Sequence, residues 1–351
     1  MIDSDTVFMK RALDQAERGA GLVSPNPMVG ALLVKNGRVV GEGFHRYDRL
    51  KHGETYAIEM AGPEARGATL YCNLEPCCHH GRTPPCTAAL IAAGIARAVI
   101  AVKDPDARVN GRGIEQLRDS GIEVDVGLLG DRARSLNESY FKFTTTGRPF
   151  IHAVIEYPAD TGKSLTEWKP SAEFFKFASK FDAVIIGSRP ELNRMVVEHA
   201  LNRERHRALV IAASASEPFL LEATQKRANG EIVVVPVGDQ SMAGTNPTVI
   251  RLEDGLTHDI AQPLIRSMLS ALKPMNVSSL LSLPGILDAS DKEVFEEFDK
   301  VTLALPTNTY QEGSPSRWIF GDIEFDLEDL SVERSGQFTE LTGYPSLQEV
   351  A

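Results

Sequence analysis

One histidine and two cysteines between residues 52 and 86 have the types and the order of a zinc-ligand set. His52-Gly53-Glu54 comes first, and Pro76-Cys77 and Cys86 follow, with eight residues between the two cysteines. One imidazole and two thiolates leave the fourth tetrahedral position of zinc to water, as in catalytic rather than structural sites. Glu54 is not needed as a ligand, so it is free to carry protons between a water molecule and a leaving amine.

This pattern is that of the zinc deaminases, whose signature is H-x-E followed by P-C-x-x-C. The second half of the signature is longer here, because the segment from Cys78 to Pro85 separates the two cysteines. His52, Cys77 and Cys86 are therefore our predicted zinc ligands, and Glu54 is the predicted catalytic acid and base.

A structural zinc site in a binding or scaffold protein is the alternative from another class. Structural sites normally close with a fourth protein ligand, and Cys78, His79 and His80 are all near enough in sequence to supply one. That interpretation gives no role to Glu54.

Two further residues upstream of His52 have polar side chains that could contact a ligand. Asn26 lies between Pro25 and Pro27, which makes its loop stiff. Its amide could read a ring amide of a substrate, or it could simply form an Asx turn. His45 lies just upstream of His52, although a lone histidine is more often an ordinary surface or core residue than a functional one.

Composition limits the classes of function. The chain has 351 residues and a net charge of −11; residues 1–147 are neutral, and residues 148–351 carry all of the excess acid. Because nucleic-acid binding normally needs a basic face, a small-molecule substrate is favoured over DNA or RNA. No run approaches the ~18 apolar residues of a membrane helix. Four cysteines within fifteen residues favour a metal site in a reducing, cytoplasmic compartment.

Helices and strands alternate through the first half, which predicts a layered α/β domain over residues 1–147. Asn36-Gly37 between two valine-rich runs predicts a hairpin. Expected helices cover residues 4–19, 54–61, 87–93, 109–120 and 131–143, expected strands cover 31–35, 38–43, 68–74, 96–102 and 122–126, and residues 144–149 form an expected linker.

The second half, residues 148–351, also reads as α/β, but it contains no comparable cluster of chemical residues. Histidines His152, His206 and His258 lack partners at ligand spacing, and no G-x-G-x-x-G phosphate loop occurs. Expected strands cover residues 150–155, 183–186, 208–211, 232–235 and 301–305, and expected helices cover 172–180 and 260–272.

Residues 4–130 resemble the deaminase half of the bacterial riboflavin-biosynthesis bifunctional deaminase/reductase family. The resemblance rests on a series of short motifs, and the long loop between the cysteines separates this family from ordinary cytidine and tRNA-adenosine deaminases. The motifs are Pro25-Asn26-Pro27, Val29-Gly30, Gly43-Phe44-His45, His52-Gly53-Glu54, Leu74-Glu75-Pro76-Cys77, His79 to Cys86, Lys103-Asp104-Pro105 and Gly111-Arg112-Gly113.

The resemblance implies a cytidine-deaminase-like three-layer domain followed by a dihydrofolate-reductase-like α/β domain. It implies Zn²⁺ as cofactor and a phosphoribosyl aminopyrimidine, 2,5-diamino-6-(5-phosphoribosylamino)pyrimidin-4-one, as the substrate that loses its 2-amino group. Asn26, His45, His79 and Arg82 fall where the family contacts the pyrimidine and its ribose phosphate. A cation at Arg82 suits a phosphorylated substrate.

The reductase half departs from the family pattern at three places. Glu156 to Asp160 replaces the Ser-Leu-Asp-Gly run, Gly187-Ser188-Arg189-Pro190 replaces Gly-x-x-Thr, and Pro284 replaces a glycine, removing an N–H donor and adding bulk. We therefore expect no NADPH binding and no reduction in this half, and retention for packing or self-association into a homo-oligomer. The alternatives are a bifunctional enzyme that still uses NADPH, and a deaminase of a related aminopyrimidine in a secondary pathway.

Overall fold

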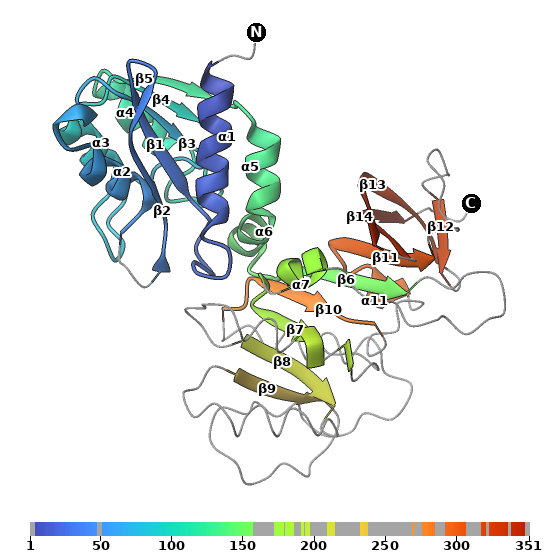
Figure 1. Ribbon diagram of the computed structural model, residues 1–351. Helices are drawn as coiled ribbons and strands as arrows, with labels where there is room; N and C mark the ends of the chain where they lie inside the picture. Colours follow the sequence, from blue (N-terminus) through green and yellow to red (C-terminus); the bar gives the residue numbers. More distant parts are fainter. Residues whose placement is uncertain are drawn as a thin grey trace. The chain divides into compact units, whose positions relative to one another are not determined.

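The chain forms two compact units in a computed structural model, Met1–Gly147 and Arg148–Ala351 (Figure 1). The structure describes all of the first unit except residues 1–3 and 48–50. In the second unit it describes residues 148–156, 172–178, 180–185, 191–192, 194–196, 209–214, 232–237, 269, 276–284, 292–306, 317–320, 323–335 and 338–347.

The first unit contains a five-stranded sheet in the order β2-β1-β3-β4-β5. Strand β1 runs antiparallel to β2 and β3, whereas β3, β4 and β5 are parallel. The elements are α1 Ser4–Glu17, β1 Gly30–Lys35, β2 Arg38–Phe44, α2 Gly53–Ala61, η2 Gly62–Ala65, β3 Thr69–Cys72, α3 Cys86–Ala93, β4 Arg97–Ile100, α4 Arg112–Asp119, β5 Glu123–Val126, α5 Gly130–Leu136 and α6 Glu138–Thr146.

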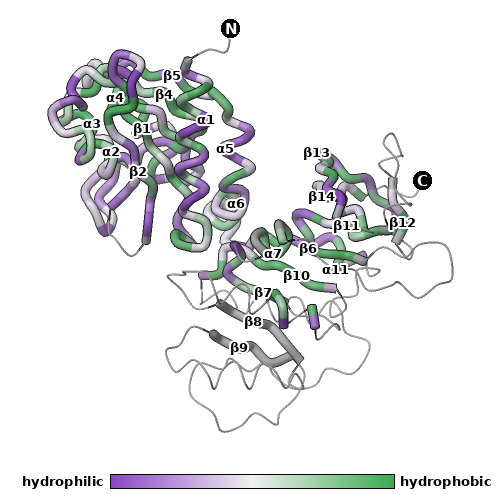
Figure 2. The backbone as a smooth tube through the Cα atoms, viewed as in Figure 1, coloured by the Kyte–Doolittle hydropathy of each residue, from purple (hydrophilic) through white to green (hydrophobic). Residues whose placement is uncertain are grey.

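Helices cover both faces of this sheet, because successive strand residues point to opposite faces and both sets are apolar. In β1, Leu33 packs with Ala57 of α2 and Leu90 of α3, whereas Leu32 packs with the α1 face. Helix α1 alternates hydrophilic and hydrophobic residues along its length, as a helix with one buried face does (Figure 2). The predicted three-layer α/β domain is confirmed.

The parallel strands bring the segments that follow them to one edge of the sheet. The segment with Cys77 follows β3, and the segment with Asp104 follows β4. Helix α2 precedes β3 and helix α3 follows it, so the amino ends of both helices reach the same edge. This edge therefore collects His52, Cys77 and Cys86.

One predicted helix of this unit is wrong. Residues 131–143 were expected to form a single helix, but the chain breaks at Asn137 into α5 and α6. The buried Asn137 side chain bonds both the N–H and the C=O of Met28, and an Asn that bonds backbone elsewhere commonly interrupts a helix. Helix α6 then runs to Thr146, into residues expected to form a linker.

The second unit contains a nine-stranded sheet in the order β12-β13-β14-β11-β6-β10-β7-β8-β9, with a hydrophobic cluster on each face. It is parallel from β11 to β9 and antiparallel from β11 to β12. Its elements are β6 Phe150–Glu156, α7 Ala172–Ala178, β7 Ala183–Ile185, β8 Leu209–Ser214, β9 Ile232–Val237, β10 Ser279–Ser282, α11 Lys292–Phe295, β11 Lys300–Pro306, β12 Arg317–Phe320, β13 Ile323–Ser335 and β14 Phe338–Leu347.

The predicted α/β class holds for this unit too, and all five expected strands are present. The expectation missed β10 and the antiparallel strands β12 to β14. The sequence of β13 does contain the alternation that is typical of a strand, because Ile323, Phe325 and Leu327 are buried and alternate with polar residues. The expected helix over residues 260–272 lies outside the described residues, apart from Leu269. Among the residues that the structure describes, no helix combines the length and apolar character needed to cross a bilayer.

His152 in β6 is a fully buried ring in the second unit. Its Nε2 lies 2.8 Å from Thr302 Oγ1, and its Nδ1 has no partner among the described residues. The rings of Phe177 and Phe181 lie against it. Burial, with a smaller contribution from the nearby charge of Lys300, lowers the pKa of His152 to about 3.

The low pKa of His152 predicts that acid destabilises the second unit. The unfolded chain takes up a proton near pH 6.5 and the folded unit does not, so stability is lost as pH falls below that value. The free energy of unfolding of the second unit should fall by about 2 kcal/mol between pH 8 and pH 5. Both tryptophans lie in this half, so urea unfolding followed by tryptophan fluorescence reports it. The His152→Gln variant should lack this fall of about 2 kcal/mol in its free energy of unfolding. If the free energy of unfolding changed equally with pH in both proteins, the prediction would be wrong.

Candidate metal centre and active site

The amino end of α2 places His52 and Glu54. His52 is the residue that precedes the helix, and Glu54 lies in its first turn. The helix sits directly on β2, because a Cβ at Gly43 would lie 2.4 Å from Tyr56 Cβ and 2.5 Å from the carbonyl oxygen of Gly53. Glycine at position 43 therefore fixes how deeply the start of α2 enters the site.

Cys77 and Cys86 approach His52 from two other directions. Cys86 is the first residue of α3, and Cys77 lies in the segment after β3. The ligand atoms of the three residues all lie within 4.8 Å of one another. His52 Nδ1 is 3.2 Å from Cys86 Sγ and 3.5 Å from Cys77 Sγ.

These distances fit a zinc ion. Bonds of about 2.0 Å to nitrogen and about 2.3 Å to sulfur place tetrahedral ligand atoms roughly 3.5 Å apart. The Cys86 thiol and then the His52 ring lower the pKa of Cys77 to about 4 through hydrogen bonds. The thiolate that a metal needs is thus already favoured at Cys77.

Cys78, His79 and His80 do not join this group. Among the described residues, only His52, Cys77 and Cys86 form a cluster that could hold a metal ion. The Cys78 thiol is directed to the carbonyl oxygen of Arg108, at 3.5 Å. The described part of the chain therefore offers three ligands and no fourth, which is the arrangement of an open site.

Glu54 is a buried carboxyl group beside the three ligands. Its side chain is only 3% exposed, and its Oε2 has no hydrogen-bond partner in the described part of the chain. Burial raises its pKa above the ordinary glutamate value. A buried carboxyl group that keeps one oxygen without a partner among the described residues is suited to accept and return a proton.

Asn26 and His45 lie side by side, and both line the cavity that also contains His52, Glu54 and Cys77. Asn26 Nδ2 is 3.2 Å from His45 Nε2, and His45 Nδ1 is 3.1 Å from the carbonyl oxygen of Lys51. A carbonyl can only accept, so Nδ1 carries the proton and Nε2 accepts from Asn26. The Asn26 carbonyl oxygen is then left to receive a donor from a ligand.

Two asparagines that the sequence did not single out hold the Asn26 loop. Asn137 donates to the carbonyl oxygen of Met28 and accepts its N–H, at 2.9 and 2.8 Å. Asn73 donates to the same carbonyl oxygen and accepts the N–H of Gly30. Their signal in the sequence is weak, since a single Asn near a strand or helix end is common.

A cavity of about 630 Å³ joins these groups, a size typical of small-molecule sites. Every predicted site residue except Cys86 lines it: Asn26, His45, His52, Glu54, Cys77, His79 and Arg82. The Arg82 guanidinium lies over the Tyr47 ring, 4.7 Å from its centre. His79 Nδ1 is buried and unpartnered among the described residues.

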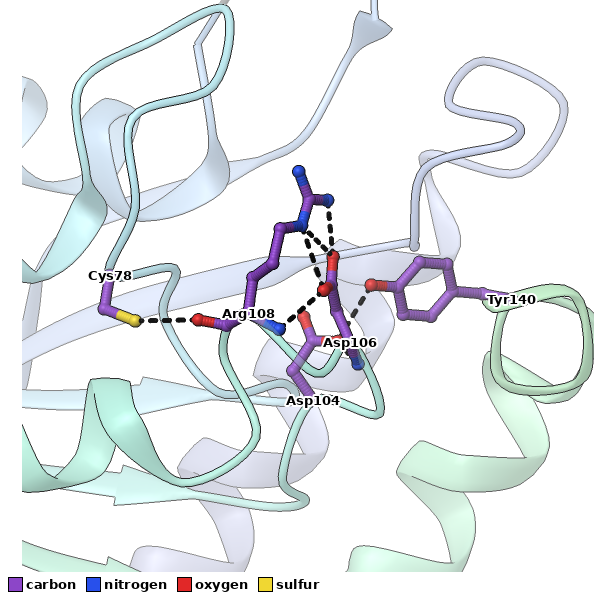
Figure 3. A network of polar contacts seen from close by, with 5 residues as sticks. All are labelled: Cys78, Asp104, Asp106, Arg108 and Tyr140. Atoms are coloured by element: carbon purple, nitrogen blue, oxygen red, sulfur yellow. Dashed lines mark hydrogen bonds and ion pairs between the residues drawn. The ribbon is translucent and has the colours of Figure 1, made fainter. Parts of the chain in front are cut away.

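An acidic network that the sequence did not predict forms another wall of the cavity (Figure 3). Tyr140 donates to Asp104 Oδ1 at 2.8 Å, and the backbone N–H of Asp106 donates to the same oxygen. Burial raises the pKa of Asp104 to about 6. Asp106 binds the Arg108 guanidinium through both of its oxygens, which lowers the pKa of Asp106.

Comparison with known proteins agrees with this geometry. Residues 2–102 match the cytidine and deoxycytidylate deaminase zinc-binding region. The riboflavin biosynthesis protein RibD of Aquifex aeolicus is 50% identical over 147 residues, which is 42% of this chain and 41% of that protein. RibD of Synechocystis is 37% identical over 226 residues, 62% of this chain and 61% of that protein.

The likeness to a solved structure covers both units. The diaminohydroxyphosphoribosylaminopyrimidine deaminase/5-amino-6-(5-phosphoribosylamino)uracil reductase of Thermotoga maritima superposes with a TM-score of 0.71 at 28% identity. The match covers 98% of this chain and 99% of that one. The chain is a homologue of the RibD proteins.

The sequence matches to the RibD proteins are uneven in extent. The chain spans about half the length of the curated RibD relatives it matches, from 40% in Escherichia coli to 65% in Actinobacillus pleuropneumoniae. The three-layer unit with the metal cluster thus carries most of the detectable RibD sequence similarity, and the longer match to the Synechocystis relative extends into the second unit.

The three-ligand geometry predicts that Cys77 and Cys78 differ sharply in their importance for zinc. Cys77→Ser should weaken zinc binding by more than about 100-fold, the upper end of what outer-shell changes cost, because a serine hydroxyl is not ionised near neutral pH. Cys78→Ser should bind zinc like the unchanged protein. Competition with a chromogenic chelator measures both affinities, and a comparable loss in Cys78→Ser would indicate a closed, structural site.

Proposed function

We propose that the first unit hydrolyses an exocyclic amine of a phosphoribosyl aminopyrimidine, with 2,5-diamino-6-(5-phosphoribosylamino)pyrimidin-4-one as substrate. The products are the 5-amino-uracil ribotide and ammonia. The observation that carries the proposal is the convergence of His52, Cys77 and Cys86 beside the buried, half-unpartnered Glu54 in one cavity. The substrate follows from the activity by which the Thermotoga relative is named.

His52, Cys77 and Cys86 would hold the zinc ion that this chemistry uses. When bound, zinc lowers the pKa of a water molecule towards ~7 and so supplies a nucleophile near neutral pH. The protein's part is to keep two thiolates and one neutral imidazole at tetrahedral spacing and to leave one side open to the cavity.

Glu54 moves the protons. It accepts a proton from the attacking water and donates it to the nitrogen of the departing amine, so that the nitrogen leaves as ammonia. The carbon–nitrogen bond to the amine breaks, the oxygen from water stays on the ring carbon, and it becomes the new carbonyl as its remaining proton passes to the adjacent ring nitrogen. Burial suits Glu54 to this work, because its raised pKa lets it hold the proton between the two transfers.

The remaining lining residues recognise the substrate. Asn26, oriented by His45, presents an amide oxygen that accepts from a ring N–H or an amino group. Arg82 and the unpartnered nitrogen of His79 line the same cavity and offer donors to the ribose phosphate. Arg82 is exposed, and its stacking on the Tyr47 ring favours one position of the guanidinium at the rim of the cavity.

For the second unit we propose a packing or assembly role without reduction. What supports this is the sequence at the three departures from the reductase pattern. Residues 157–160 and 187–190 of these departures lie outside the described residues. The second candidate is a bifunctional deaminase/reductase. The match to the Thermotoga deaminase/reductase over 98% of the chain favours that candidate.

The two candidates differ in their products. The zinc-loaded protein is incubated with the diaminopyrimidine ribotide, with and without NADPH, and the products are identified by mass. We expect ammonia and the deaminated ribotide in both reactions and no loss of NADPH absorbance. A reduced, ribityl product with NADPH would establish the bifunctional enzyme, whereas unchanged substrate in both reactions would overturn the proposed deamination.

Glu54→Gln separates zinc binding from proton transfer. The amide has the same shape but cannot accept and return a proton, so kcat should fall by about 10²- to 10⁴-fold. Zinc content should remain at one ion per chain, because Glu54 is not among the three ligands. Turnover at the normal rate in this variant would show that another group carries the proton.

A further inference from the structure

Glu75 is a buried carboxylate that the proposed reaction does not use. It lies two residues before Cys77 and is 3% exposed. Its Oε1 accepts the N–H groups of Gly113 and Ile114, at 2.9 and 3.1 Å. Its Oε2 accepts the N–H groups of Gly111 and Asp104, at 2.9 and 3.2 Å. Although Glu75 borders the cavity, backbone donors occupy both of its oxygens.

Three of these four hydrogen bonds, those from Gly111, Gly113 and Ile114, tie the start of α4 to the segment that carries Cys77. The first N–H groups of a helix have no partner within the helix, and the helix start favours a negative charge. Glu75 supplies the acceptor and the charge together. It also holds the N–H of Asp104, so the same carboxylate anchors the cavity wall that contains Asp104.

The peptide between Glu75 and Cys77 is pressed against α4 as well. A Cβ at Gly113 would lie 2.2 Å from the carbonyl oxygen of Pro76, so this approach requires glycine. The ring of Pro76 restricts its own φ. With Glu75 bonded and Pro76 packed, little freedom remains in the backbone that leads to Cys77.

A second connection joins α4 to the other cysteine. Thr87 follows Cys86 in α3, and its hydroxyl donates to Gln116 Oε1 of α4 at 2.8 Å. The backbone N–H of Thr87 donates to the carbonyl oxygen of Cys77 at 3.2 Å. Helix α4, which lies beyond the matched zinc-binding region of residues 2–102, thus contacts the neighbours of both thiols.

We propose that Glu75 is a positioning residue of the metal centre: it fixes the Cys77 segment to α4, the helix that also holds the Cys86 segment through Thr87, and so sets the spacing of the two cysteines. The inference rests on the proposed function in one respect, that the His52, Cys77 and Cys86 cluster holds zinc. It does not depend on which amine is hydrolysed.

The test compares two Glu→Gln variants of the full chain. Glu75→Gln turns an NH₂ group towards backbone donors and should weaken zinc binding by about 10- to 100-fold, the cost usual for outer-shell partners of a metal site. Glu64→Gln removes the same charge from an exposed ion pair with Arg38 and should leave zinc binding unchanged. Chelator competition gives the affinities, and the absorption bands of the cobalt-substituted proteins report the ligand geometry.

A purely structural role for Glu75 would lower the thermal stability but leave zinc affinity and the cobalt spectrum unchanged, and that result would overturn the proposal. Thr87→Val is the second variant, should Glu75→Gln not fold. It removes only the hydroxyl that reaches Gln116, and it too should weaken zinc binding; unchanged affinity would count against α4 as the support. Weaker zinc binding in a protein that never deaminates the ribotide would sustain the positioning role and refute the proposed substrate.

Discussion

The active site depends on one geometric constraint, that three side chains separated by up to 34 residues must meet within 4.8 Å. No local rule brings them together, because one ligand precedes α2, one follows β3 and one begins α3. What brings them together is the parallel arrangement of β3, β4 and β5. Strand ends and helix starts then share one edge of the sheet, where ligand sites of open α/β sheets usually form.

This arrangement tolerates little movement, because backbones approach one another without side chains between them. A Cβ at Gly30 would lie 2.2 Å from the carbonyl oxygen of Ala12 in α1, and one at Gly43 would strike the first turn of α2. Such contacts fix helix positions to within a fraction of an ångström. The chain therefore places its glycines where the layers touch, and the metal ligands inherit their spacing from these contacts.

The sequence predicted the cluster of His52, Cys77 and Cys86 and the fold class of the first unit. It predicted far less well the residues whose hydrogen bonds hold this site in place. His-x-Glu and Pro-Cys are short, ordered signals whose chemistry can be read directly. Asn73, Asn137 and Tyr140 act through one or two hydrogen bonds each to residues far away in the sequence, and no sequence spacing predicts such bonds. The break at Asn137 was missed for the same reason: local periodicity favoured one helix, and a long-range bond to Met28 interrupts it.

The strands of the second unit that the sequence did not predict were missed for another reason. Strands β6 and β11 are continuous apolar runs, which a parallel, doubly covered sheet requires, and they were predicted. Strand β13 alternates apolar and acidic residues, so its composition resembles a polar loop unless the period of two is counted. Acidic residues on the outer face, such as Glu328 and Glu333, also account for part of the negative charge of this half.

Three buried carboxyl groups at the cavity illustrate how environment assigns different tasks to the same chemical group. Glu75 accepts four backbone N–H groups and has no oxygen left for chemistry. Asp104 accepts a phenol and one N–H, and burial raises its pKa to about 6. Glu54 keeps an oxygen without a partner among the described residues. Since hydrogen bonds to the charged form oppose protonation and burial favours it, the number of donors decides which carboxyl group can exchange a proton. This criterion supports our proposals that Glu54 carries the proton and that Glu75 holds the site in shape.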